Sequence, residues 1–145
     1  MQPVPEILMV DDNPADIALV CEAMAEGKRR CKVHSVEDGM EAMSFLRREG
    51  RYAESVRPDL VVLDLNLPKK DGRKVLAEVK DNPELRGIPV VIFSTSQAGG
   101  DVVSCYELGA NCYVSKPMNL AGFFGAIHSI EEFWFGLAIL PKKGD

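Results

Sequence analysis

The stretch Pro58-Asp59-Leu60-Val61-Val62-Leu63-Asp64 decides the fold class of this chain. Its four consecutive apolar residues, 60–63, are typical of a β-strand that is buried on both faces of a parallel sheet. The following segment, 65–72, contains a proline and a glycine and therefore predicts a loop. Asp64 is thus expected at the carboxyl end of a central strand, which is the edge where ligands bind in an open α/β sheet.

The same pattern recurs near the N-terminus. Residues 7–10 (ILMV) predict another buried strand, Asp11 and Asp12 follow it, and Pro14 suits the first turn of a helix. If the two strands are neighbours, Asp11, Asp12 and Asp64 converge, and like charges about 4 Å apart repel by roughly 4 kcal/mol at an effective dielectric near 20. A divalent cation removes that cost, and oxygen ligands favour Mg²⁺, Mn²⁺ or Ca²⁺ over zinc. One such aspartate alone fits a helix N-cap, but three together favour a metal site.

Two further predicted strands also end in polar residues. Pro89–Phe93 is followed by Ser94, and Asn111–Ser115 is followed by Lys116. A hydroxyl and an ammonium beside a metal site favour phosphoryl chemistry, because the cations neutralise phosphoryl oxygens and the hydroxyl donates a hydrogen bond. Singly, Ser94 fits a turn and Lys116 a solvated surface charge. Their repeated placement at one edge favours the functional interpretation.

Strands and helices alternate along the chain, which predicts βαβ units with right-handed crossovers. Five such units predict an α/β, flavodoxin-like (βα)5 fold with a parallel sheet in the order 2-1-3-4-5, which brings strands 1 and 3 together. The remaining strand is predicted at Cys31–Val36. The helices are predicted from Pro14 to about Glu26, from Asp38-Gly39 onward, from a cap at Asp71 to Asn82-Pro83, from about Asp101 to Leu108, and from near Asn119 with apolar residues at 120, 123, 124, 127, 130, 134 and 137.

The chain resembles the receiver domain of two-component response regulators over nearly its whole length. The resemblance rests on Asp11-Asp12, Asp64, Ser94, Tyr113 and Lys116-Pro117. A closer similarity is to the single-domain regulators paired with bacterial and cyanobacterial phytochromes. That similarity rests on the segments DLNLP (64–68) and YELGANCY (106–113) and on the aromatic tail around Glu132-Phe133-Trp134.

The resemblance implies a reaction and a ligand set. Asp64 would accept a phosphoryl group from a phosphohistidine of a sensor histidine kinase, with Mg²⁺ as cofactor, Mn²⁺ as an alternative, and slow autodephosphorylation. Asp12, Asp64 and the backbone carbonyl of Asn66 would ligate the cation, and Asp11 would do so directly or through water. Lys116 would pair with Asp64 before the reaction and with the phosphoryl group afterwards, so that catalysis is positioning and charge neutralisation.

The resemblance also implies a switch. Ser94 would move toward the phosphoryl oxygens and the ring of Tyr113 would follow, which alters the face formed by the fourth helix, fifth strand and fifth helix. Tyr113 by itself also fits a half-buried strand aromatic. Lys116-Pro117 resembles the family's cis peptide, which would direct the ammonium inward, although most X–Pro bonds are trans.

A length of 145 residues fits one domain, predicted as a core at about 5–130 and an aromatic tail at about 131–145. Phe133, Trp134 and Phe135 crowd both sides of the last helix, which predicts a partner surface, most simply that of a homodimer. The alternative is a tail that folds back over its own domain.

Composition excludes several other classes. The net charge of −5 argues against a nucleic-acid partner. The chain shows neither a signal-peptide pattern nor an apolar stretch of membrane-spanning length, so we expect a cytoplasmic protein with no membrane partner. The spacing of the cysteines resembles no zinc site, which predicts reduced thiols, and the two histidines are isolated from acidic partners in the sequence. The cysteines and histidines are Cys21, Cys31, Cys105, Cys112, His34 and His128.

Three alternatives remain beside the regulator hypothesis. A dehalogenase-type aspartyl-phosphate phosphatase also uses a strand-end aspartate, but on its first strand and followed two residues on by a second aspartate. Here that second position is Asn66, and the acceptor follows the third predicted strand. A scaffold without phosphorylation would have lost an acid or the lysine, and all are present. A phosphate shuttle and a regulator that binds a downstream effector are not distinguished by the sequence.

Overall fold

The computed structural model describes residues 3–141, so residues 1–2 and the predicted tail positions 142–145 lie outside it. Its sheet has five parallel strands in the order β2-β1-β3-β4-β5, as the sequence predicts. The strands are β1 (Glu6–Val10), β2 (Lys32–Val36), β3 (Leu60–Leu63), β4 (Val90–Ser94) and β5 (Cys112–Ser115).

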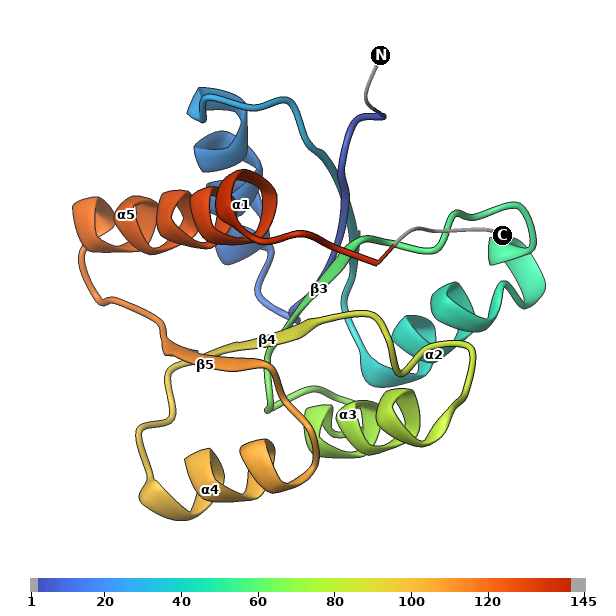
Figure 1. Ribbon diagram of the computed structural model, residues 1–145. Helices are drawn as coiled ribbons and strands as arrows, with labels where there is room; N and C mark the ends of the chain where they lie inside the picture. Colours follow the sequence, from blue (N-terminus) through green and yellow to red (C-terminus); the bar gives the residue numbers. More distant parts are fainter. Residues whose placement is uncertain (1–2, 142–145) are drawn as a thin grey trace.

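Helices cover both faces of the sheet (Figure 1). One layer holds α1 and α5, and the other holds α2, α3 and α4. The helices are α1 (Pro14–Glu26), α2 (Gly39–Arg47), the short 3₁₀ turn η1 (Gly50–Tyr52), α3 (Gly72–Asp81), α4 (Gly99–Glu107), α5 (Leu120–Glu131) and the π-helical turn η2 (Glu132–Leu137). Within the described residues, no helix combines the length and apolar character needed to cross a membrane.

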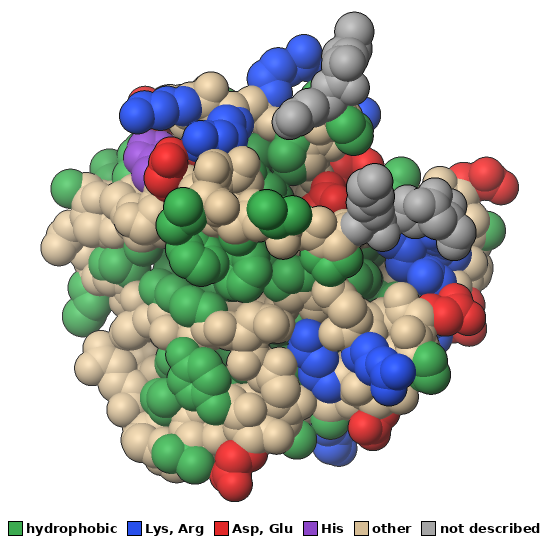
Figure 2. Space-filling model, in the orientation of Figure 1, with side chains coloured by type: hydrophobic (Ala, Val, Ile, Leu, Met, Phe, Trp, Pro, Cys, Tyr) green, Lys and Arg blue, Asp and Glu red, His purple; other side chains and the backbone are tan. Residues whose placement is uncertain are grey.

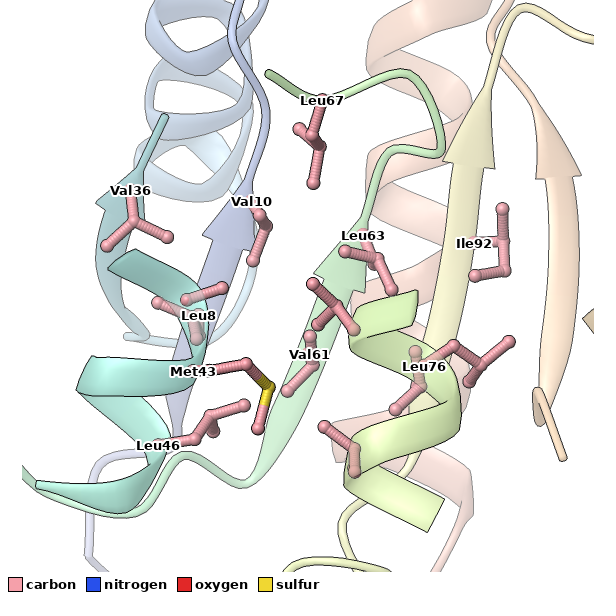
Figure 3. Close-up of a cluster of buried hydrophobic side chains, with 14 of the residues drawn as sticks. Leu8, Val10, Val36, Met43, Leu46, Val61, Leu63, Leu67, Leu76 and Ile92 are labelled. Atoms are coloured by element: carbon pink, nitrogen blue, oxygen red, sulfur yellow. The ribbon is translucent and has the colours of Figure 1, made fainter. Parts of the chain in front are cut away.

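Two hydrophobic clusters hold the central strands in place. Alternate residues of β1 point to opposite faces, so that Ile7 and Met9 pack with α1 and α5 while Leu8 and Val10 pack with α2 and α3. Figure 3 shows the second cluster, in which Leu46 from α2 and other aliphatic side chains meet the strands. Each such fully buried side chain contributes about 1.5–3 kcal/mol. The carboxyl ends of β1, β3 and β4 are therefore fixed relative to one another.

Side-chain caps start the helices where the sequence predicts. Asn13 precedes α1 and accepts hydrogen bonds from the backbone N–H groups of Ala15 and Asp16. Asp71 accepts from the backbone of Arg73 at the start of α3, and Asn119 caps α5 in the same way.

Two helix boundaries differ from the prediction. Helix α4 begins at Gly99 rather than near Asp101, because the paired glycines adopt helical geometry and the Asp101 backbone N–H reaches the Ala98 carbonyl at 3.0 Å. The last helix widens after Glu131, where the regular period gives way to a π turn in which Ala138 donates to the Phe133 carbonyl at 2.7 Å. An apolar periodicity cannot distinguish these two helix types over a single turn.

Candidate functional site

Three aspartates meet at the carboxyl ends of β1 and β3. Val10 and Leu63 are register partners, and Asp11 and Asp64 follow them directly. The Asp64 backbone N–H donates to the Val10 carbonyl at 2.9 Å, which holds the two strand ends together. One oxygen from each of Asp11, Asp12 and Asp64 lies within 4.8 Å of the others. Asp11 and Asp64 are buried, whereas Asp12 is exposed, so the cluster opens to solvent on one side.

The Lys116 ammonium lies against this cluster. It donates to Asp11 Oδ2 at 2.7 Å, to Asp16 Oδ2 at 2.9 Å and to Asp64 Oδ2 at 3.0 Å. Its side chain is only 6% exposed, and its Nζ also lies 5.9 Å from the centroid of the Phe93 ring. The backbone N–H of Lys116 donates to the Ser94 carbonyl at 2.8 Å, so β4 and β5 position the lysine jointly.

Burial and pairing shift the pKa values of these groups. Burial alone would lower the pKa of Lys116, but hydrogen bonds to Asp11 and Asp16, followed by that to Asp64, outweigh it and raise the pKa above its ordinary value. Burial raises the pKa of the Asp11 carboxyl, an effect that the hydrogen bond from Lys116 opposes. Lys116 is therefore charged at neutral pH.

The donor set fits a hard divalent cation. Every candidate side-chain ligand is a carboxylate oxygen, and the Lys116 ammonium offsets only part of the negative charge at the site. The carboxylates are also oriented, because Asp64 Oδ1 accepts from the Leu65 N–H at 2.7 Å and Asp11 Oδ1 accepts from the Asn13 N–H at 2.9 Å. Asn66, the predicted backbone ligand, is an exposed residue of the loop after β3.

Close packing fixes that loop. The Gly72 N–H donates to the Leu65 carbonyl at 2.8 Å, and a Cβ on Gly72 would lie 2.2 Å from the Asp64 carbonyl oxygen. Only glycine permits this approach of α3 to the strand end. The backbone on both sides of Asp64 is thereby held in one conformation.

The predicted switch residues occupy the neighbouring strand ends. Ser94 is fully buried at the end of β4, and its Oγ accepts from the Ser96 backbone N–H at 3.3 Å. The Tyr113 hydroxyl donates to the Ser96 carbonyl at 2.8 Å, and its ring packs against the core cluster beneath α3 and α4. Burial raises the pKa of Tyr113. The loop that follows Ser94 is therefore hydrogen-bonded to both Ser94 and Tyr113.

Sequence reasoning missed Asp16 and a polar network that lies next to the loop after Ser94. In that network the Arg73 guanidinium donates to Asp101 at 2.6 Å, and the Ser96 hydroxyl donates to the same carboxylate at 2.6 Å. These bonds lower the pKa of Asp101, the bond from Ser96 most strongly. Arg73 and Asp101 are 28 residues apart, so no local spacing relates them. The spacing of Asp16 from Asp12, four residues, was the one available signal for Asp16.

The implied cis peptide is absent. No cis peptide bond occurs in residues 3–141, so the Lys116–Pro117 bond is trans, in keeping with the intrinsic preference of X–Pro bonds. The ammonium nevertheless points inward, because the three carboxylates that accept its hydrogen bonds lie there.

The aromatic tail divides between core and solvent. Phe133 is 48% exposed, whereas Trp134 and Phe135 are half-buried and pack against the cluster beneath α1 and α5. Trp134 and Phe135 also line a shallow hollow with Pro5 and Asp59 from the opposite end of the sheet. The described part of the tail thus folds back in part and leaves other apolar side chains exposed.

An acidic cluster, a buried hydroxyl and a buried lysine thus lie together at the carboxyl edge of a 2-1-3-4-5 sheet, as expected for a receiver domain. Residues 7–128 match the response regulator receiver domain, and the chain belongs to that family. This finding decides against the dehalogenase-type alternative.

The chain is similar to known phytochrome response regulators. It is 47% identical over 135 residues to response regulator Rcp1 of Synechocystis sp., covering 93% of this chain and 92% of Rcp1. The crystal structure of the phosphorylated cyanobacterial phytochrome response regulator RcpA matches with a TM-score of 0.94 at 51% identity, covering 97% of this chain and all of that one. The Mn²⁺-bound form of Rcp1 matches with a TM-score of 0.91 at 46% identity, covering 95% and 99% of the two chains.

Proposed function

We propose that this chain is a response regulator whose Asp64 accepts a phosphoryl group from a phosphohistidine of a sensor histidine kinase. The observation that carries the proposal is the Asp64 carboxylate itself. It lies at a strand end beside two further acids, with one oxygen held by the Leu65 N–H and the other by the Lys116 ammonium. Such a group is an oriented nucleophile in a site that neutralises charge.

The transfer needs little from the protein beyond position. A carboxylate oxygen of Asp64 bonds to phosphorus while the bond from phosphorus to the histidine nitrogen breaks, and the electron pair of that bond remains on the imidazole. Asp64 attacks as a carboxylate, so no general base is required. Lys116 offsets the negative charge of the incoming phosphoryl oxygens, and its burial keeps the ammonium in place.

Asp11, Asp12 and Asp64, with the backbone carbonyl of Asn66, would hold Mg²⁺, with Mn²⁺ as an alternative. Oxygen donors and excess negative charge support this assignment, as does the existence of a Mn²⁺-bound form of Rcp1. When bound, the cation would neutralise charge on the carboxylates and on the phosphoryl oxygens.

Ser94 and Tyr113 would transmit the change in charge to the face formed by α4, β5 and α5. Two bonds support this role. The Lys116 N–H joins β5 to the Ser94 carbonyl, and the Tyr113 hydroxyl joins β5 to the loop after β4. A movement of Ser94 toward the phosphoryl group would therefore pull on both contacts, and we assign the altered face to a downstream effector.

The partner kinase would be of the phytochrome type, since the chain is similar to Rcp1 and RcpA over most of its length. A kinase that draws its phosphoryl group from ATP acts in the cytoplasm, so we place the exchange there. The free cysteines accord with a reducing compartment.

Acetyl phosphate tests the acceptor directly. Incubation of the protein with acetyl phosphate and Mg²⁺, followed by intact mass measurement, should show one added phosphoryl group. Asp64→Asn should abolish the addition, whereas the control Asp81→Asn, which changes an exposed acid at the end of α3, should retain it. Undiminished labelling of Asp64→Asn would contradict the assignment.

We further propose a homodimer through the C-terminal region that includes Phe133, Trp134 and Phe135. Figure 2 shows apolar side chains gathered across the middle of one face of the molecule. In the tail, Phe133 is 48%, Leu137 74% and Ile139 98% exposed, which is unusual for residues this apolar on an isolated domain.

Light scattering measures this association. The wild-type protein should have a dimer mass, and combined replacement of Phe133 and Leu137 by Glu should give a folded monomer. Met40→Glu changes a comparably exposed apolar residue on α2 and should leave the dimer intact. A wild-type protein that stays monomeric at high concentration, with or without phosphate, would refute the dimer.

A further inference from the structure

Lys116 has more carboxylate partners than a simple pair with the acceptor requires. An ammonium carries three protons, and here each is donated to a different carboxylate, those of Asp11, Asp16 and Asp64. The distance to Asp16, 2.9 Å, is as short as the distance to Asp64, 3.0 Å. Asp16 is thus a full partner of the buried ammonium.

Asp16 differs from the other two hydrogen-bond acceptors of Lys116 in the element that carries it. It lies in the first turn of α1, whereas Asp11 and Asp64 follow strands, and the three-aspartate cluster does not include it. Its position is nevertheless fixed relative to the cluster. Asn13 Oδ1 accepts from the Asp16 N–H at 3.3 Å, and the Asn13 N–H donates to Asp11 Oδ1 at 2.9 Å. Two hydrogen bonds made by Asn13 therefore connect Asp16 to Asp11, which is one of the proposed cation ligands.

The three acceptors would change differently during the reaction. On the function proposed above, Asp11 becomes a cation ligand and Asp64 becomes an acyl phosphate, so both give up carboxylate charge that the ammonium uses. Asp16 alone of the three neither binds the cation nor carries the phosphoryl group, so its full negative charge remains available to the ammonium. We propose that Asp16 is a positioning residue, which holds the Lys116 ammonium beside the phosphoryl group when Asp11 and Asp64 are otherwise engaged.

A merely structural role for Asp16 predicts something else. An acid in the first turn of a helix is stabilising through the helix dipole, whatever the state of the site. Loss of that effect would change stability equally with and without a phosphoryl group. The test must therefore compare the two states.

The ammonium signal of Lys116 supplies that comparison. In ¹H–¹⁵N NMR spectra of the full chain, a lysine NH₃⁺ held by hydrogen bonds gives a slowly exchanging signal, which Lys116→Arg identifies by its loss. The wild-type signal should persist with chelator and with Mg²⁺ plus beryllofluoride, a mimic of the phosphoryl group. Asp16→Ala should retain the signal with chelator, when Asp11 and Asp64 still accept, and lose it with beryllofluoride.

Kinetics provide a second readout. Asp16→Ala should slow phosphorylation by acetyl phosphate by about tenfold or more, as expected for loss of a hydrogen bond between charged groups. Its Mg²⁺ affinity should fall by no more than about fivefold, because a partly solvated charge outside the ligand set is lost. Asp16→Glu should recover part of the rate. Glu22→Ala, which removes an exposed acid from the same helix, should behave as wild type.

The outcomes separate the two proposals. An Asp16→Ala signal that persists with beryllofluoride, or that is lost equally in both states, overturns the positioning role while Asp64 remains the acceptor. Asp16→Asn, which preserves the shape of the side chain, takes the place of the alanine variant in both measurements if that variant does not fold. A wild-type protein that takes up neither beryllofluoride nor phosphate refutes the proposed function, and this inference with it.

Discussion

Replacement of Asp12 by Asn should stabilise the protein without cation and weaken its response to Mg²⁺. The site holds the carboxylates of Asp11, Asp12, Asp16 and Asp64 around the single ammonium of Lys116. Asp12 is the exposed member of the cluster, so Asn can replace it without repacking the core. The substitution removes one repelling charge and one cation ligand together.

The expected size follows from the geometry. The carboxylate oxygens of the cluster lie within 4.8 Å of one another, and at that distance two unit charges repel by about 3.5 kcal/mol at an effective dielectric of 20 and by about 0.9 kcal/mol in water. Exposure of Asp12 places its interactions near the lower value, and attraction to Lys116 offsets part of them. We therefore expect a net stabilisation of about 1 kcal/mol in chelator. A cation at about 100 times its Kd stabilises the wild type by about 2.7 kcal/mol, so the order of stability should invert with Mg²⁺.

Urea denaturation followed by far-ultraviolet circular dichroism measures both effects. Unfolding curves of the wild type and Asp12→Asn in EDTA and in excess Mg²⁺ give four free energies of unfolding. Glu22→Gln, an exposed acid in the middle of α1, controls for the change in net charge. An Asp12→Asn protein that is less stable than wild type in EDTA, or equally stabilised by Mg²⁺, would refute the reasoning.

Three further substitutions, with Gly125→Ala as a control, probe the surroundings of the site. Gly72→Ala should lower the free energy of unfolding by about 1–3 kcal/mol, since its Cβ would meet the Asp64 backbone. Gly125→Ala, which has open space around its Cβ, should raise the free energy of unfolding by up to about 1 kcal/mol. The midpoints of urea denaturation measure both changes. Tyr113→Phe should cost about 1 kcal/mol in the same assay, because the hydrogen bond to Ser96 is lost. The pKa of Asp101 is lowered in the folded protein, so this carboxylate contributes stability above its unfolded pKa, and that stability is lost as the pH falls through the folded pKa. Asp101→Asn should therefore flatten the acid limb of a plot of stability against pH. An unchanged acid limb would argue against this role.

The fold could be predicted because its central strands have an unusually clear pattern. Residues 60–63 and 7–10 are apolar throughout, as expected for short strands covered on both faces, and all of these residues are buried. Strand order then followed from the alternation of strands and helices. The spatial grouping of Asp11, Asp64 and Lys116 could be predicted for the same reason, since each lies directly after a strand.

The remaining features depend on contacts that local patterns do not encode. Asp16 resembles an ordinary first-turn acid, because that position favours negative charge without any partner. Its pairing with Lys116 joins residues 100 positions apart. The pairing of Arg73 with Asp101 likewise depends on how α3 packs beside α4. The π turn after Glu131 lies outside what apolar periodicity can resolve.

The acyl phosphate itself tests the central claim most directly. Borohydride reduces an aspartyl phosphate to homoserine, which marks the phosphorylated residue in the peptide sequence. After treatment with acetyl phosphate and Mg²⁺, reduction and digestion, mass spectrometry should find homoserine at position 64 and aspartate unchanged at positions 11 and 12. Homoserine at position 11 or 12, or unmodified Asp64 in protein that is shown to be folded and Mg²⁺-bound, would contradict the account.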